Sequence, residues 1–270
     1  MVDLASIDQG KGVTVLELFL DEARRTHRPA LGLWCTLSHT LVAEAMAAAG
    51  PDYVCIDMQH GTTSAVHLVS MIQAVVAGGS TPIVRVPELN PASIMLALDS
   101  GARGVIVPLV ETAEQAAAAV AACRYPPYGT RSFGPFRASM QAQTTDPREL
   151  EKVACIVMIE TRKGIDNAEA IVATEGVTGV YLGPSDLSLA LGLPPGSIEH
   201  LAFIEARDRI VALCRAHNVA ACMHCYSGKA ATKAVEQGFD MVTVSADLGP
   251  LRQLLASELE LARSAGAVEA

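Results

Sequence analysis

The chain has 270 residues, of which half are hydrophobic and 4% aromatic, and its net charge is −9 at neutral pH. This apolar content excludes a disordered chain, and the acidic balance without basic clusters argues against nucleic acid as a partner. No apolar run approaches the roughly 20 residues of a membrane span, and the acidic N-terminus lacks a signal-peptide core. Seven cysteines, an odd number scattered through apolar stretches, are typical of reduced thiols in a cytoplasmic protein.

Short apolar runs rich in β-branched residues recur along the chain and predict eight strands. Runs of this kind are typical of parallel strands that are buried on both faces. The predicted strands are Leu31–Trp34, Tyr53–Asp57, Pro82–Val86, Gly104–Pro108, Ala154–Glu160, Gly179–Gly183, Val219–Met223 and Asp240–Val244.

Alanine-rich amphipathic stretches separate these runs and predict helices between the strands. Glycines follow several of the stretches, at Gly50, Gly101 and Gly238, where glycine is the expected helix stop. The predicted helices are Val13–Arg25 before the first strand and then Leu41–Ala49, Ala65–Ala77, Pro91–Ser100, Ala113–Cys123, Asp166–Thr174, Phe203–His217, Lys229–Gln237 and Leu251–Ser264.

Strand-then-helix units behind a leading helix predict an α/β fold, a single (β/α)8 TIM barrel over residues 1–270. A doubly wound open sheet is the alternative. It would need fewer strands and usually a glycine-rich phosphate turn, and the sequence contains no such motif. One connection, Arg124–Lys152, is long and rich in proline and arginine, and loops of that length are usually functional or mobile.

Polar residues that end the apolar runs are the candidates for chemistry, because barrel enzymes carry their catalytic groups at the carboxyl ends of the strands. Although far apart in sequence, these residues would converge on one rim. They are Asp57, Gln59 and His60 after the second strand, Arg85 at the end of the third, Glu160 at the end of the fifth, and Gly183, Pro184, Ser185 and Asp186 after the sixth.

Glu160 and Asp186 are one βα unit apart and should lie on neighbouring strand ends. Two carboxylates there, with water in the remaining positions, suit a hard divalent ion such as Mg²⁺ or Mn²⁺. The alternative is two isolated acids, with Asp186 capping the helical turn that follows it. The spacing alone leaves both interpretations open.

Arg85 interrupts an apolar strand at its carboxyl end, where it is either an anion clamp or half of a barrel salt bridge. His60 is either a general base, tuned by an aspartate such as Asp57 or Asp99, or an incidental loop histidine. His224, at another strand end, is a further candidate for lining the pocket. No lysine lies inside a predicted strand, which disfavours a Schiff-base mechanism.

Seven segments carry motifs that are specific when taken together. They are Gly32–Trp34 (GLW), Ile56–Gly61 (IDMQHG), Pro82–Pro87 (PIVRVP), Leu98–Thr112 (LDSGARGVIVPLVET), Arg124–Ser132 (RYPPYGTRS), Ile159–Asn167 (IETRKGIDN) and Gly179–Gly192 (GVYLGPSDLSLALG). With these segments the chain resembles the HpcH/HpaI family of class II, metal-dependent pyruvate aldolases. The resemblance extends from about Gly32 to Leu254, nearly the whole chain.

The resemblance implies a (β/α)8 barrel that assembles as a hexamer, a trimer of dimers whose subunits exchange the last helix. It implies that Glu160 and Asp186 bind a divalent metal, Mg²⁺ or Mn²⁺ with Co²⁺ as a further option, and that no organic cofactor is required. The metal would chelate the carboxylate and keto oxygens of pyruvate. Arg85 would contact the same keto oxygen and stabilise the enolate.

The resemblance also implies that His60, oriented by Asp99 with Asp57 nearby, handles the proton of the aldol hydroxyl. Backbone amides around Ser185 and Asp186 would hold the pyruvate carboxylate, and Arg131 would bind a distal carboxylate of the substrate. We therefore expect a carbon–carbon lyase that reversibly cleaves a 4-hydroxy-2-oxo acid to pyruvate and an aldehyde.

Two departures from the family pattern concern the pocket. Many members have glutamate where this chain has Gln59, which can hydrogen-bond water at the metal but cannot ionise, and many have glutamine in place of Met158. A second hypothesis is therefore enolate condensation or decarboxylation with a keto acid such as oxaloacetate, for which Arg124, Arg131 and Arg137 would suit extra carboxylates. A third is a non-catalytic barrel that binds a keto acid.

Overall fold

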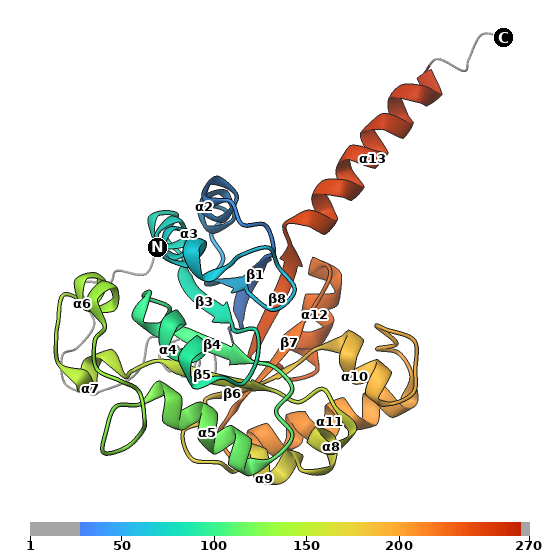
Figure 1. Cartoon of the computed structure of the whole chain (residues 1–270). Coiled ribbons are helices and arrows are strands. Elements are labelled where there is room, and N and C mark those ends of the chain that lie inside the picture. The colour runs from blue at the N-terminus through green and yellow to red at the C-terminus, as the bar shows by residue number, and fades with distance from the viewer. Residues whose placement is uncertain (1–27, 266–270) are drawn as a thin grey trace.

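Eight parallel strands close into a barrel in chain order, each paired with the next and β8 paired with β1 (Figure 1). This computed structural model describes residues 28–265, so the predicted helix Val13–Arg25 lies outside the described residues. The closed barrel confirms the predicted fold and excludes the open sheet. The strands are β1 Ala30–Cys35, β2 Tyr53–Asp57, β3 Thr81–Arg85, β4 Gly104–Val107, β5 Ala154–Met158, β6 Gly179–Leu182, β7 Ala220–His224 and β8 Met241–Ala246.

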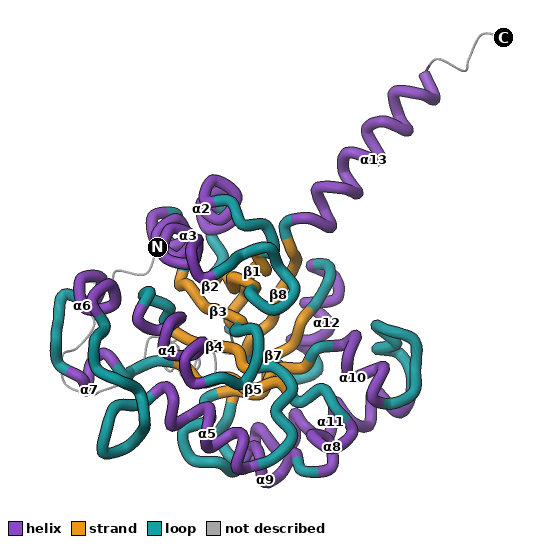
Figure 2. The backbone as a smooth tube through the Cα atoms, in the orientation of Figure 1, coloured by secondary structure: helices purple, strands orange, loops and turns teal. Residues whose placement is uncertain are grey.

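Helices surround the ring of strands (Figure 2). The helix predicted at Asp166–Thr174 is two short helices that meet at Asn167, whose side-chain amide donates to the backbone carbonyl of Glu111 at 2.8 Å. The described helices are α2 Thr40–Ala48, α3 Ala65–Ala77, α4 Pro91–Asp99, α5 Ala113–Cys123, α6 Phe136–Ala142, α7 Pro147–Leu150, α8 Arg162–Asp166, α9 Ala168–Val172, α10 Pro184–Ala190, α11 Leu201–Ala216, α12 Gly228–Glu236 and α13 Leu248–Ala265.

The core has two parts, because alternate residues of each strand point into the barrel and outward to the helices. Inside the barrel lie large side chains such as Tyr53, Ile156 and Tyr181. The hydroxyls of both tyrosines contact Oγ1 of Thr243, at 3.0 and 2.7 Å, so these buried polar atoms are satisfied. A Cβ on Gly32 would lie 2.0 Å from the Tyr53 ring, so the glycine of β1 is what lets this ring fill the barrel.

The long connection between α5 and β5 lies at the amino-terminal face of the barrel, the end where the strands begin. It contains two short helices, α6 and α7, that the sequence pattern did not predict. Because α5 runs antiparallel to the strands, the chain leaves this helix at the end opposite the carboxyl ends of the strands. This connection is therefore remote from the rim where barrel enzymes carry their chemistry.

The last helix, α13, follows β8 directly and extends away from the barrel (Figure 1). Its leucines are exposed, from 40% at Leu248 to 67% at Leu261. A helix with an apolar stripe normally buries that stripe. Within one chain, α13 therefore presents an apolar face without a partner among the described residues. None of the helices in residues 28–265 is both long and apolar enough to cross a membrane.

Candidate active site

A cavity at the carboxyl ends of the strands brings together most of the predicted site residues. Its wall includes residues from the ends of β1, β2, β3, β5, β6 and β7, as the strand-end argument expects. The lining residues are Trp34, His60, Arg85, Met158, Glu160, Tyr181, Gly183, Pro184, Ser185, Asp186, His224 and Tyr226.

Arg85 is held against the cavity by Asp57, the residue beside it on β2. Nε and Nη2 of Arg85 donate to the two oxygens of Asp57 at 2.9 and 2.6 Å, and Trp34 Nε1 donates to the same carboxylate at 3.2 Å. The guanidinium also lies 4.9 Å from the centre of the Trp34 ring. Burial acts to raise the pKa of Asp57, but the hydrogen bonds and charge of Arg85 outweigh it and lower that pKa below its ordinary value. The pair is therefore ionised and fixed.

Glu160 presents an unused carboxylate oxygen. Its side chain is buried, with the residue 2% exposed, and Oε1 accepts a hydrogen bond from the Leu109 amide at 3.0 Å. Oε2 is buried and has no hydrogen-bond partner among the described residues. Burial, with the charge of Asp186 added, raises the pKa of Glu160 to about 7. A buried acceptor without a partner is costly, so this oxygen calls for a ligand.

Gly183 makes room for that oxygen. A Cβ on this residue would lie 2.6 Å from Oε2 of Glu160, too close for any side chain. Asp186 follows in the first turn of α10, exposed to solvent on the wall of the same cavity. The glycine in the predicted motif thus lets the Glu160 carboxylate approach the turn that carries the second acid.

The donor set fits a hard divalent cation. Oε2 of Glu160 and the exposed carboxylate of Asp186 are the oxygen ligands that Mg²⁺ and Mn²⁺ prefer. Across residues 28–265, no group of three or more histidine, cysteine, aspartate or glutamate side chains could hold a metal ion. A metal bound here would therefore take its remaining ligands from water or substrate, as Mg²⁺ commonly does.

His60 lies on the exposed rim of the cavity. Its backbone amide donates to Oδ1 of Asp57 at 3.3 Å, and the amide of Gln59 donates to the same oxygen at 3.0 Å. Asp57 thus holds the loop that carries His60 and also binds Arg85. The imidazole ring of His60 makes no hydrogen bond with the described residues. Gln59 does not line the cavity. Its Oε1 is buried and has no hydrogen-bond partner among the described residues.

Asp99 and Arg131 lie at the amino-terminal face and are not brought to His60 or to the cavity within one chain. Nη2 and Nε of Arg131 donate to Oδ1 of Asp99 at 2.7 and 3.3 Å, and Nη1 donates to the Leu150 carbonyl at 3.3 Å. The Arg131 residue is 1% exposed, and its guanidinium lies 4.6 Å from the centre of the Tyr125 ring. Asp99 ends α4, which runs antiparallel to the strands, so the strand-end rule does not apply to it.

His224 and Tyr226 also line the cavity, although the sequence pattern predicted no chemical role for either. His224 packs edge-on against Trp34 and Tyr226, with ring centres 4.9 and 5.0 Å apart, and its Nδ1 lies 3.4 Å from the Tyr181 hydroxyl. Burial, and then the charge of Arg85, lowers the pKa of His224 to about 4, so the ring is neutral at physiological pH. The hydroxyl of Tyr226 contacts Oγ of Ser185 at 3.0 Å. The sequence signal for His224 was its position at the end of β7.

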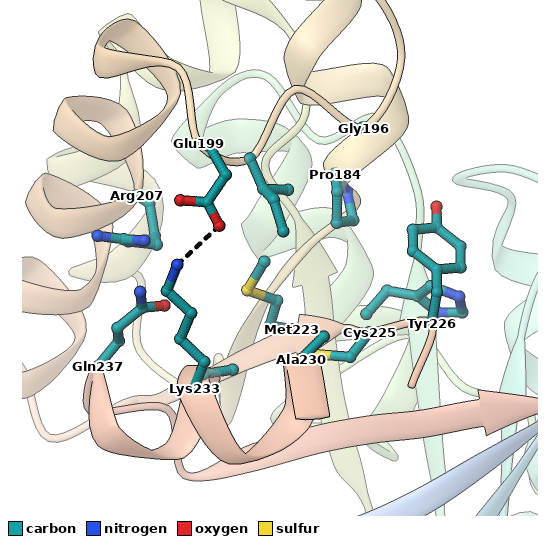
Figure 3. Close-up of a pocket in the computed structure, with 13 residues that line it drawn as sticks. Pro184, Gly196, Glu199, Arg207, Met223, Cys225, Tyr226, Ala230, Lys233 and Gln237 are labelled. Atoms are coloured by element: carbon teal, nitrogen blue, oxygen red, sulfur yellow. Dashed lines mark hydrogen bonds and ion pairs between the residues drawn. The ribbon is translucent and has the colours of Figure 1, made fainter. Parts of the chain in front are cut away.

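A second cavity adjoins the first and shares Pro184, His224 and Tyr226 with it (Figure 3). Much of its wall is apolar, and the ion pair between Lys233 of α12 and Glu199 spans 2.7 Å at its far side (Figure 3). It contains no pair of carboxylates comparable with Glu160 and Asp186. The first cavity is therefore the candidate active site.

Comparison with known proteins identifies the family. The HpcH/HpaI aldolase/citrate lyase family profile matches residues 30–253. The hydroxypyruvate/pyruvate aldolase of Rhizorhabdus wittichii is 38% identical over 240 residues, which cover 85% of this chain and 94% of that protein. The 5-keto-4-deoxy-D-glucarate aldolase of Klebsiella pneumoniae is 36% identical over 233 residues, which cover 85% of this chain and 91% of that protein.

A solved structure of a citrate synthase is also similar. Its TM-score is 0.79 at 28% identity, and the match covers 92% of this chain and 98% of that one. The family match spans most of the chain, and both curated relatives are aldolases. The chain therefore belongs to the HpcH/HpaI aldolase/citrate lyase family and is a carbon–carbon lyase.

Proposed function

We propose that the protein is a divalent-metal-dependent aldolase that reversibly cleaves a 4-hydroxy-2-oxo acid to pyruvate and an aldehyde. The observation that carries the proposal is the free, buried Oε2 of Glu160, which shares one cavity with Asp186 and with the fixed guanidinium of Arg85. When bound between the two carboxylates, Mg²⁺ or Mn²⁺ would act as a Lewis acid toward the keto oxygen of the substrate. No organic cofactor is needed for this reaction.

Arg85 stabilises the charge that develops on cleavage. Asp57 occupies Nε and Nη2, and Nη1 makes no hydrogen bond with the described residues, so Nη1 can donate to the substrate's keto oxygen. Breaking the carbon–carbon bond leaves negative charge on that oxygen, as an enolate. A guanidinium already fixed in place stabilises this charge without reorganising.

His60 takes the proton of the C4 hydroxyl as that group becomes the aldehyde. Its place on the open rim suits a base that works on the acceptor half of the substrate, beyond the buried Glu160. The backbone amides of Ser185 and Asp186 hold the pyruvate carboxylate, because amides in the first turn of a helix such as α10 have no partners within the helix. Gln59 precedes His60 in the loop that Asp57 holds through two backbone amides.

We further propose a homo-oligomer in which α13 packs on a second copy of the chain, since its leucines are exposed in one copy. The resemblance to the family predicts a hexamer of exchanged dimers. The roles predicted for Asp99 and Arg131 also depend on assembly. Because both lie at the amino-terminal face, they could reach substrate only in the cavity of a second copy.

The second candidate function is transfer of the enolate to a keto acid such as oxaloacetate, and the likeness to a citrate synthase supports it. Arg124 and Arg137, however, lie in the connection at the amino-terminal face, where Arg137 donates to the side chain of Gln141 at 2.9 Å. Neither can read an extra carboxylate in the cavity of its own chain. The aldehyde acceptor is the better supported of the two, because both curated relatives are named aldolases.

The test is pyruvate release from a 4-hydroxy-2-oxo acid by metal-stripped protein, with and without added Mg²⁺ or Mn²⁺. We expect release only with metal, and none with either ion from Glu160→Gln, which loses the charge but keeps the size. Metal-independent release, or wild-type turnover by the variant, would refute the proposal. Pyruvate binding without release, followed by turnover with oxaloacetate, would favour the second candidate.

A further inference from the structure

A cavity of about 210 Å³ opens at the amino-terminal face of the barrel, remote from the proposed active site of the same chain. It lies between the C-terminus of α5, the end of α7 and the residues that lead into β5 and β6. Its wall carries three cationic side chains, Arg124, Arg148 and Lys152, and one carboxylate, Glu151. Nothing in the proposed reaction uses these residues.

Arg124 is the unusual member of this cluster. It is half-buried, directly after α5, and its guanidinium lies over the backbone of Gly176, where a Cβ would be 3.0 Å from Nη2. No carboxylate pairs with Arg124 among residues 28–265. A partly desolvated charge without a counter-ion is unfavourable, so this position is prepared for an anion that comes from outside the chain.

The other charges on the wall are already engaged. Arg148 pairs with Asp146 at 3.0 Å, and Lys152 pairs with Glu149 at 2.7 Å. Asp146 and Glu149 do not line the cavity. An anion beside Arg124 would therefore lie near two further cations, each of which already has an acidic partner, and the Arg148 side chain is mostly exposed to solvent.

Glu151 is the group that opposes an anion. Its Oε2 accepts a hydrogen bond from the Tyr125 amide at 3.1 Å, which holds the carboxylate against the backbone. The side chains that line the cavity carry three positive charges and one negative charge, but Arg148 and Lys152 are paired with Asp146 and Glu149 just outside it. Among the described residues, Arg124 is the cation of this wall that no carboxylate pairs with.

We infer that this cavity binds a small divalent oxyanion of the phosphate class, with Arg124 as its principal ligand. A guanidinium offers two parallel N–H donors that match two oxygens of a phosphate, and the ammonium of Lys152 adds a point charge. The volume is several times the roughly 30 Å³ that one water occupies in the liquid, so a tetrahedral anion and some of its waters fit. The ligand is either free phosphate or the phosphoryl group of a small ester.

The test is calorimetric titration of the purified full-length protein with inorganic phosphate, at constant ionic strength with chloride as the balancing anion. Binding rather than thermal stability is measured, because phosphate stabilises many proteins without a specific site. We expect saturable binding at one site per chain. Arg124→Gln should weaken it at least about tenfold, which corresponds to the loss of one good charge-assisted contact.

Arg252→Gln is the matched control, since it removes the same charge from exposed helix α13 and should leave the affinity unchanged. If Arg124→Gln does not fold, Lys152→Gln should weaken binding instead. A parallel titration with glycerol phosphate separates the two sources: binding of both ligands assigns the site to phosphoryl groups, and binding of phosphate alone assigns it to the free ion. No saturable heat with phosphate, or equal affinity in wild type and Arg124→Gln, would overturn the inference.

Discussion

Asp57 and Arg85 are register partners on neighbouring strands β2 and β3, and two hydrogen bonds of 2.9 and 2.6 Å join their side chains. The strand pairing brings the two residues side by side, and the cavity wall buries them together. The Asp57 carboxylate therefore accepts hydrogen bonds from the Arg85 guanidinium and from the backbone of His60, but not from the His60 ring.

Asp57→Ala should destabilise the protein by about 3–5 kcal/mol, because it leaves the buried Arg85 guanidinium without its partner. Unfolding by denaturant measures the change. Glu199→Ala, which breaks the exposed pair with Lys233, is the control and should change the free energy of unfolding little. An equal effect of the two substitutions would show that the Asp57–Arg85 pair is not a structural element of the site.

Glu160 should make the stability of the metal-free protein depend on pH. Its pKa is about 7 in the folded protein and about 4.5 ordinarily, so the folded state holds this proton more tightly than the unfolded state does. Ionising the buried Glu160 therefore lowers the free energy of unfolding. This loss of stability is absent below about pH 4.5, grows as the pH rises, and is complete above about pH 7. Glu160→Gln should therefore be more stable than wild type at pH 8, by on the order of 3 kcal/mol, and equally stable at pH 4. Chemical unfolding at both pH values checks this, and a gain of the same size at pH 4 would contradict it.

Gly183→Ala should weaken metal binding by tenfold or more. The new Cβ would lie 2.6 Å from Oε2 of Glu160 and would displace the carboxylate. Titration of the metal-stripped variant with Mn²⁺ measures the effect. Gly134→Ala is the control, since a Cβ there has no atom within 4 Å and should leave the affinity as it is. Unchanged Mn²⁺ affinity in Gly183→Ala would argue against Glu160 as a ligand.

His60→Ala should lower the rate of aldol cleavage by about 10²–10⁴-fold, the range expected for loss of a general base. Binding of metal and pyruvate should persist, because Glu160, Asp186 and Arg85 remain in place. His67→Ala, in nearby helix α3 and outside the cavity wall, serves as the control. If pyruvate binding falls as much as turnover, the histidine holds the substrate rather than moving the proton.

Leu254→Glu combined with Leu255→Glu should reduce the molar mass of the particle in solution. These side chains are 58% and 55% exposed in the single chain, and contact with a second copy would bury them. Light scattering behind a size-exclusion column gives the mass. Leu201→Glu changes an equally exposed leucine at the start of α11 and should leave the mass unchanged. A wild-type particle that is monomeric at working concentrations would refute the proposed role of α13.

The sequence by itself determined the barrel and most of the cavity. Short apolar runs separated by amphipathic stretches have one closed arrangement that buries both faces of every strand, and the structure confirms it. Since parallel strands all end on one rim, Arg85, Glu160 and the turn after β6 had to converge there. The same rule predicted a rim position for His60.

Only the tertiary structure decided which side chains the rim residues contact. It also decided where the predicted residues outside the strand ends lie. Asp57 pairs with Arg85 because strand register sets them side by side, which no spacing along the chain reveals. Asp99, Arg124 and Arg131 lie at the amino-terminal face because the helices beside them run antiparallel to the strands. The physical reason is that strand periodicity is encoded locally, whereas a side chain's partners depend on which distant elements pack against it.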